Sequence, residues 1–350
     1  MNQKKNIGVV GCGEVADGHL KAWNNVPSTE VVAVCDLNES LAKSTVKNWK
    51  IPNYFTSIEK LLESTELDVV DVCTPPHTHR SIAVQVMNAG SNIIIEKPMT
   101  MTVEDSEEIV EVQKKTGVMA GVLHNWLFEP PIVKADLLVK RGLLGEVFNV
   151  EIEAISTKHD AMASNKDHWC HKFPGGRFSE MLPHPIYLVR NFLGEFIIKD
   201  VQVSKVGNYP WMKSDELCAT LESGNKYGRV YVSFNSPRDA IFVDIYGEKG
   251  ILKIDIINAT LNFLPARKVT RFGKATDSFR QAGHLISSTF KNAFDVVSGR
   301  WMDGHELYIE RFARSLDENL DPPISVQEGL EVIKNLEEMC TIIEELERKR

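Results

Sequence analysis

The sequence predicts an α/β protein whose N-terminal part is a doubly wound parallel sheet covered by helices on both faces. Short apolar segments of strand type alternate with amphipathic helical segments through the first third of the 350-residue chain. Glycines directly follow the first of these strands. Strands buried on both faces read as continuous apolar runs, and their alternation with helices is typical of parallel crossover units.

Five strands and the helices between them justify this fold class in chain order. Each predicted strand is short, apolar and rich in β-branched residues, whereas each helical segment mixes charged and apolar positions. The strands are 7–10, 31–35, 69–73, 93–95 and 118–123, and the helices begin near Gly18 and cover 39–49, 81–89 and 103–116.

Composition narrows the class of protein. The chain is 43% hydrophobic and 25% charged, and its net charge of −8 argues against nucleic acid and anionic membranes as partners. The N-terminus lacks a secretory apolar run, and no apolar stretch approaches the ~20 residues of a membrane helix. None of the six cysteines forms a C-x-x-C pair. We therefore expect a reduced, cytoplasmic protein of about two domains.

The glycines after the first strand predict a dinucleotide site. The segment runs Gly11-Cys12-Gly13-Glu14-Val15-Ala16, which is G-x-G-x-x-A between a strand and a helix. The first glycine permits the tight turn, the second lets the backbone approach the pyrophosphate, and the small third residue lets the helix pack closely. The helix N-terminus offers N–H groups to phosphate. The alternative is a glycine turn that binds no ligand.

Asp36 favours NAD over NADP. It ends the second strand, at the distance from the glycines where an acidic residue accepts hydrogen bonds from the adenosine ribose. A carboxylate there repels a 2′-phosphate. The alternative role is that of a helix N-cap.

Two further segments carry a family resemblance. The third strand ends in Cys73-Thr74-Pro75-Pro76-His77-Thr78-His79, and the fourth ends in Glu96-Lys97-Pro98. With the glycine turn, these motifs resemble the Gfo/Idh/MocA family, the glucose–fructose oxidoreductase and inositol dehydrogenase group. The likeness covers nearly the whole chain, because it continues at 124–130, 141–146, 169–176 and 322–325.

The resemblance implies two domains, a Rossmann domain over 1–124 and an α+β domain over 125–350 with a large, mostly antiparallel open sheet. One sheet face would carry the active site, and the other would form a homodimer or homotetramer. Strand-like segments at 146–155, 201–206, 219–222, 228–235 and 241–247 agree with this. The sequence also predicts a C-terminal helix over 328–349, which can pack back on the first domain.

The resemblance also implies the cofactor residues and a catalytic lysine. Lys97 would place a cation beside the substrate oxygen and stabilise the negative charge that develops there; the alternative is a surface lysine. In many family members the bond before the following proline is cis. The expected cofactor-binding residues are Gly11, Gly13, Glu14, Val15, Ala16, Asp36, Thr74, Pro75, His79, Glu96, Lys97 and Asn125.

The second catalytic element of the family, D-x-G-x-H, corresponds here to 180–184. His184 matches the family histidine and suits proton exchange with a hydroxyl group, whereas Glu180 and Leu182 replace aspartate and glycine. Because prolines disfavour a helix interior, we expect a helix that begins near Pro183 and ends at Gly194. The alternative is a structural histidine.

The stretch before this element contributes candidate substrate residues. His168, Trp169 and Arg177 could line a sugar pocket, because aromatic and basic side chains fit polyols and phosphate groups. The neighbouring H-x-C-H spacing at 168–171 is not a zinc pattern, so we expect no metal.

The predicted function is an NAD-dependent oxidoreductase that transfers a hydride between nicotinamide and a hydroxyl-bearing carbon of a sugar, polyol or sugar nucleotide. In this scheme Lys97, His184 and Glu180 are the catalytic residues. One alternative is an enzyme that uses tightly bound NAD for transient oxidation during glycoside cleavage or epimerisation. The other is a non-catalytic NAD-binding regulatory protein, which the replacements at Glu180 and Leu182 motivate.

Overall fold

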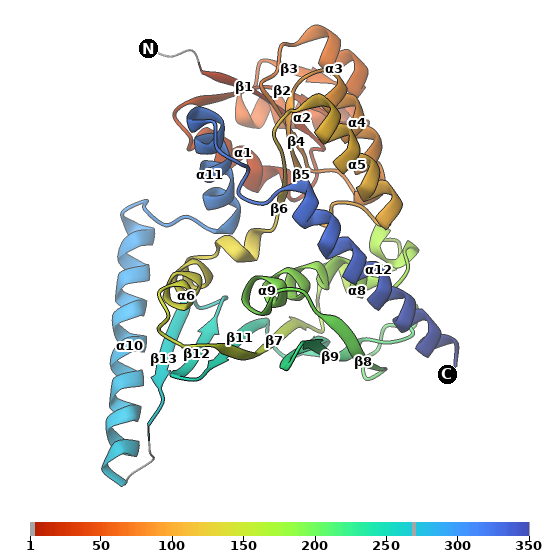
Figure 1. Ribbon diagram of the computed structural model, residues 1–350. Helices are drawn as coiled ribbons and strands as arrows, with labels where there is room; N and C mark the ends of the chain where they lie inside the picture. The colour runs from red at the N-terminus through yellow and green to blue at the C-terminus, as the bar shows by residue number, and fades with distance from the viewer. Residues whose placement is uncertain (1–3, 268–270, 350) are drawn as a thin grey trace. The chain divides into compact units, whose positions relative to one another are not determined.

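The computed structural model describes residues 4–267 and 271–349, which form two compact units (Figure 1). The first unit comprises Met1–Asn125 and Gly304–Glu337, and the second comprises Trp126–Asp303 and Glu338–Arg350. The chain therefore leaves the first unit after Asn125 and returns to it at Gly304. In the part of the chain that the structure describes, no helix is long and apolar enough to cross a membrane.

The first unit contains the predicted parallel sheet, with six strands in the order β3-β2-β1-β4-β5-β6. All its strand pairs are parallel. The order reverses between β1 and β4, which is where open α/β sheets bind ligands at the carboxyl ends of their strands. The strands are β1 (Lys5–Val10), β2 (Thr29–Cys35), β3 (Asn53–Phe55), β4 (Val69–Val72), β5 (Asn92–Glu96) and β6 (Ala120–Leu123).

Helices connect these strands, and their ends follow local sequence signals. Asn38 caps α2 through its side chain, which accepts hydrogen bonds from the Ser40 and Leu41 amides. Gly117 ends α5 with a φ of 72°. The helices are α1 (Ala16–Asn24), α2 (Glu39–Trp49), α3 (Ile58–Ser64), η1 (Pro76–Thr78), α4 (His79–Asn88) and α5 (Val103–Thr116). The bounds of α2 and α5 are those predicted, whereas β3 and α3 are too short for the pattern to reveal.

Two late helices complete the first unit. α11 (Gly304–Glu318) buries Tyr308, Ile309 and Phe312 completely. Beside them lies Gly121 of β6, where a Cβ atom would come within 2.4 Å of the Tyr308 hydroxyl oxygen. α12 (Val326–Arg348) begins in the first unit, and its residues from Glu338 onward belong to the second.

The second unit contains a seven-stranded sheet in the order β13-β12-β11-β7-β10-β9-β8. It is mostly antiparallel as predicted, with β7 and β10 the parallel pair. The strands are β7 (Val147–Thr157), β8 (Ile197–Ser204), β9 (Glu216–Ser223), β10 (Lys226–Ser236), β11 (Ala240–Gly247), β12 (Gly250–Asp255) and β13 (Thr260–Pro265). β12 and β13 lie outside the strand segments predicted from the sequence.

Helices of the second unit flank this sheet. α9 (Pro183–Leu193) begins and ends where the two prolines and Gly194 predict, and it packs on β7 and β10. α10 (Arg271–Val297) follows β13 and contacts it. The other helical segments are η2 (Asn125–Phe128), α6 (Pro130–Lys140), α7 (Ala161–Ser164), η3 (Trp169–Lys172) and α8 (Arg177–Met181).

Candidate active site

The turn after β1 requires glycine at Gly11. Its φ is +93°, and a Cβ atom there would lie 2.8 Å from the carbonyl carbon of Cys73 at the end of β4. The Gly11 amide donates a hydrogen bond of 2.8 Å to the Cys35 carbonyl at the end of β2. The turn is thus fixed against the ends of both neighbouring strands, and a side chain would displace it.

Gly13 has a different environment from Gly11. Apart from Gly13 and its two chain neighbours, no heavy atom of the described residues lies within 4 Å of a Cβ built on Gly13. Glu14 and Val15 are exposed, and α1 starts at Ala16. The turn therefore presents backbone without side-chain cover at the N-terminal end of α1, which is the position predicted for a pyrophosphate.

Asp36 lies beside this turn. Its Oδ2 accepts a hydrogen bond of 2.8 Å from the Cys12 amide, and its Oδ1 accepts one of 2.8 Å from the Asn38 amide. Asn38 and not Asp36 is the N-cap of α2. The carboxylate is half-buried at the carboxyl end of β2.

The loops that follow β4 and β5 are tied together by His79. This buried ring places Nε2 2.6 Å from the Thr74 carbonyl oxygen and Nδ1 3.1 Å from the carbonyl oxygens of Pro98 and Met99. Burial lowers the pKa of His79. Pro75, the N-cap of η1, lies in the same loop. The Lys97–Pro98 peptide bond is cis.

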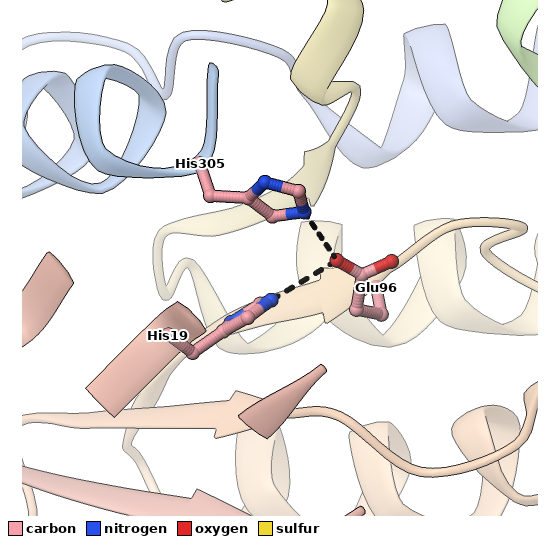
Figure 2. Close-up of side chains that lie close together, drawn as sticks. All are labelled: His19, Glu96 and His305. Atoms are coloured by element: carbon pink, nitrogen blue, oxygen red, sulfur yellow. Dashed lines mark hydrogen bonds and ion pairs between the residues drawn. The ribbon is translucent and has the colours of Figure 1, made fainter. Parts of the chain in front are cut away.

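Glu96 anchors the backbone of Lys97. Its Oε2 accepts a hydrogen bond of 2.8 Å from the Lys97 amide, while its Oε1 lies 3.0 Å from Nε2 of His19 and 3.7 Å from Nε2 of His305 (Figure 2). The Glu96 side chain is 7% exposed. Three elements, α1, β5 and α11, supply these side chains.

His19 is a fully buried cation between two carboxylates. Its Nδ1 lies 2.8 Å from Asp71 Oδ2, and Trp23 Nε1 donates a hydrogen bond of 2.7 Å to the same oxygen. Burial disfavours the charge, but the carboxylate of Asp71 outweighs burial and raises the pKa of His19 well above its usual value. Burial likewise opposes ionisation of Glu96, yet the hydrogen bond and charge of His19 lower its pKa to about 2.

These groups could also form a metal ligand set, because single ligand atoms of His19, Glu96 and His305 lie within 4.8 Å of one another. A protonated imidazole has no free lone pair for a metal. The raised pKa of His19, with a carboxylate at each ring nitrogen, therefore favours an ion-pair network over a metal site.

This network was not predicted from the sequence, although one signal for it is present. Asp71 interrupts the apolar strand 69–73, and a carboxylate in a strand buried on both faces requires a partner. His124 was also missed as a site residue. It is buried, and burial together with the Lys97 charge lowers its pKa to about 3, so its ring is neutral.

In the second unit, His184 stacks on an aromatic ring. The rings of His184 and Trp126 are 4.0 Å apart and inclined by 16°. His184 Nδ1 lies 2.6 Å from the Tyr187 hydroxyl, which accepts a hydrogen bond of 3.1 Å from the Trp126 amide. Tyr187 lies one helical turn beyond His184 on α9, a spacing from which sequence reasoning could have found it.

Glu180 and Arg177 form an ion pair with each other. Arg177 Nη1 donates to Glu180 Oε2, and its Nε and Nη2 donate to Asp160 over 3.2 and 3.0 Å. Burial opposes the cation, but the two carboxylates outweigh burial and raise the pKa of Arg177. Arg177 is only 4% exposed, although it contributes to the wall of a cavity of about 290 Å³.

The remaining candidates are distributed over both units. His168 is the N-cap of η3 and its ring lies 5.2 Å from that of Trp169. Asn125 is buried at the start of η2. The first unit brings the predicted cofactor residues to one edge of its sheet, and Lys97 is there as well. His168, Trp169, Arg177, Glu180 and His184 belong to the second unit.

Comparisons with known proteins agree with this architecture. Residues 5–124 match the oxidoreductase family with an NAD-binding Rossmann fold, and residues 137–343 match that family's C-terminal alpha/beta domain. The uncharacterized oxidoreductase YrbE of Bacillus subtilis is 23% identical and covers 95% of this chain and 92% of its own. Myo-inositol 2-dehydrogenase of Thermotoga maritima is also 23% identical, over 73% of this chain and 76% of its own.

Solved structures share the whole fold. The WlbA dehydrogenase from Bordetella pertussis, in complex with NADH and UDP-GlcNAcA, superposes with a TM-score of 0.78 at 19% identity and covers 97% of each chain. A putative myo-inositol dehydrogenase from Sinorhizobium meliloti also reaches a TM-score of 0.78, at 18% identity, with 99% of this chain and 98% of its own covered. Because both sequence domains match over most of its length, this chain belongs to the Gfo/Idh/MocA oxidoreductase family.

Proposed function

We propose that this protein is an NAD-dependent oxidoreductase that transfers a hydride between nicotinamide and a hydroxyl-bearing carbon of a sugar, polyol or sugar nucleotide. The observation that carries the proposal is the position of Lys97. It directly follows β5, at the same sheet edge as the glycine turn after β1 and the carboxylate of Asp36. A cation at that edge stands where a reacting oxygen would meet a dinucleotide.

The residues of this edge fit NAD. Gly11 keeps the turn tight, and the uncovered backbone at Gly13 leaves space for a pyrophosphate. Asp36 offers a carboxylate to ribose hydroxyls and repels a 2′-phosphate, which favours NAD over NADP. When bound, NAD supplies the hydride acceptor or donor of the reaction.

Lys97 stabilises negative charge on the substrate oxygen. Its backbone amide is held by Glu96, whose own carboxylate is fixed by His19. The buried network therefore fixes the backbone from which the Lys97 side chain extends. A preorganised cation lowers the barrier because no reorganisation is needed when the charge develops.

His184 exchanges the substrate proton at Nε2. Its Nδ1 faces the Tyr187 hydroxyl, and Trp126 stacks on its ring, so two partners define its orientation. We assign this step to His184 and not to Glu180, because Glu180 is paired with the buried Arg177. Glu180 then acts by orienting the segment that precedes α9.

The substrate class rests on the relatives named above and on the family. Two of those relatives are named as myo-inositol dehydrogenases, and a third was solved with a sugar nucleotide. His168 and Trp169 are the candidate substrate contacts, and Arg177 contributes to the wall of a cavity in the same unit. The family resemblance adds a homo-oligomer formed through the sheet of the second unit.

Binding and turnover test the proposal separately. Calorimetric titration of the full chain should give NAD a Kd at least tenfold below that of NADP, and Asp36→Ala should reduce this preference. NADP binding tenfold tighter than NAD would overturn the cofactor assignment. A panel of sugars, polyols and sugar nucleotides is then screened by NADH absorbance with the wild type.

Lys97→Met should reduce turnover about 100-fold or more while the Kd for NAD changes less than threefold. Lys60→Met, which removes an exposed lysine of the same unit, is the matched control and should leave turnover unchanged. His184→Asn should lower kcat as well. Turnover that persists unaltered in both site variants would refute the assigned roles.

A further inference from the structure

The long helix α10 exposes a continuous apolar stripe. Phe279 is 79% exposed, Ile286 58%, Phe290 75% and Val297 87%. Phe294, next to this line, is 61% exposed. Single exposed apolar residues are ordinary on protein surfaces, but several large ones on one helix face mark an interaction site.

The spacing of the stripe is that of a helix-pairing seam. Apolar or small residues recur at alternating intervals of four and three, which is the a/d pattern of a heptad repeat. The positions are Phe279, Gly283, Ile286, Phe290, Ala293 and Val297. We call these six residues the α10 seam.

The face of α10 opposite the seam lies toward the protein's own sheet, and it is polar. Ser288, Asn292 and Asp295 are the half-buried positions of the helix between 278 and 297. Asn292 Nδ2 donates a hydrogen bond of 3.0 Å to the Ala259 carbonyl just before β13. Figure 1 shows α10 alongside β13, the edge strand of the sheet. A surface helix normally packs its apolar face inward, whereas α10 turns its polar face toward the sheet and its apolar face outward.

We propose that the α10 seam is covered by the α10 seam of a second copy of this chain, paired antiparallel about a two-fold axis. The seam is self-complementary in that orientation. With Ile286 set opposite Phe290, Gly283 falls opposite Ala293 and Phe279 opposite Val297. Small residues then face small ones, which lets the two helices approach closely. Two-fold dimers are the commonest closed assemblies, and each uses one patch twice.

The apolar area suits such a dimer. A buried aromatic side chain contributes about 150–250 Å², and three phenylalanines of α10 are exposed by 61–79%. They supply much of the about 800 Å² per partner that a stable interface buries. Ile286 and Val297, which are 58% and 87% exposed, add to that area.

A membrane surface fits the same helix less well. Amphipathic helices that lie on membranes carry a strongly charged polar face rich in lysine and arginine. Between 278 and 297, α10 has only Arg280 and Lys291 as basic residues besides His284, and its polar positions are mostly Ser, Thr, Asn and Gln. The net charge of −8 also opposes binding to anionic lipid.

Sedimentation velocity of the full chain from 1 to 100 µM tests the proposal. The double variant Ile286→Glu/Phe290→Glu places charges on the seam and should raise the dimer Kd at least 100-fold. The control Gln281→Glu/His284→Glu adds the same charges to exposed positions of α10 outside the seam and should keep the wild-type mass. Because the predicted sheet contact is a separate surface, a wild-type tetramer that the seam variant reduces to a dimer also supports the proposal.

Further measurements keep the test independent of folding and of catalysis. Circular dichroism should show equal helix content and melting for both double variants, and Ile286→Ala/Phe290→Ala should weaken the dimer without adding charge. A monomeric wild type at 100 µM, or a seam variant with wild-type mass, would overturn the proposal. So would a monomer that sediments with phosphatidylcholine–phosphatidylserine vesicles through the seam. NAD binding should be unchanged throughout, so failure here leaves the proposed function standing.

Discussion

Glu96 is the residue through which the buried charges of the first unit act on Lys97. One oxygen holds the Lys97 amide, and the other faces His19 and His305. Removing one partner of a buried ion pair costs more than the pair contributes, because the remaining charge is uncompensated. His19 therefore contributes both to the stability of the first unit and to the position of Lys97.

The two pKa shifts predict how this network responds to pH. The pKa of Glu96 is lowered from 4.5 to about 2, so its contribution to stability is present above about pH 4.5 and is lost as pH falls toward 2. The shift corresponds to about 3 kcal/mol. The pKa of His19 is raised, so its contribution is complete below about pH 6.5 and declines only as pH rises through the raised value.

Urea unfolding at pH 7, 5, 4 and 3 measures this dependence. The wild type should lose more unfolding free energy between pH 5 and 3 than Glu96→Gln, which has no carboxylate to protonate. Glu108→Gln removes a carboxylate that is partly exposed and pairs with Arg80 at the surface. Because surface ion pairs contribute little to stability, this control should keep nearly the wild-type slope. Equal slopes for wild type and Glu96→Gln would contradict the network.

Among the elements, the turn between β1 and α1 contains one glycine that the fold requires and another that we expect cofactor binding to require. Gly11→Ala puts a Cβ against the Cys73 carbonyl at an unfavourable φ, whereas Gly13→Ala meets no described atom within 4 Å. Gly11→Ala should therefore lower the melting temperature, by several degrees for a cost of about 1–3 kcal/mol.

Gly13→Ala should leave the melting temperature nearly unchanged without NAD and reduce the increase that NAD produces. Differential scanning fluorimetry with and without NAD, on both variants, checks the pair. If Gly13→Ala gave the full NAD-induced increase, the backbone at Gly13 would not be the site of pyrophosphate approach.

At the scale of the whole molecule, the first unit depends on a segment that the chain adds only when it returns to this unit at Gly304. α11 buries Tyr308, Ile309 and Phe312 in a unit whose other part ends at Asn125. The first 125 residues alone would expose that apolar surface to water. Burial of such side chains stabilises a fold by about 1.5–3 kcal/mol each.

A shortened chain that joins residues 4–125 to 304–337 through a flexible glycine–serine linker should unfold cooperatively in urea and bind NAD. Residues 4–125 alone should give a broad transition and bind the dye ANS, as loosely packed states do. A sharp transition for residues 4–125 alone would show that α11 is dispensable for the first unit.

The sequence by itself determined the parallel sheet, the glycine turn and the family, because these depend on local patterns: short apolar runs, residue spacing and motifs at strand ends. It also placed α9 between its prolines and Gly194. These signals lie within about 15 residues of what they describe, so one sequence reveals them.

Only the tertiary structure decided which distant residues meet. His19 and His305 both meet Glu96, His19 also meets Asp71, and Arg177 is bound by Asp160. Tertiary packing brings these residues together, and their distance apart in the sequence does not predict that they meet. The tertiary structure also decides that the α10 seam is exposed. The sequence contains the heptad spacing of the seam, but only the fold shows that this face of the helix points outward.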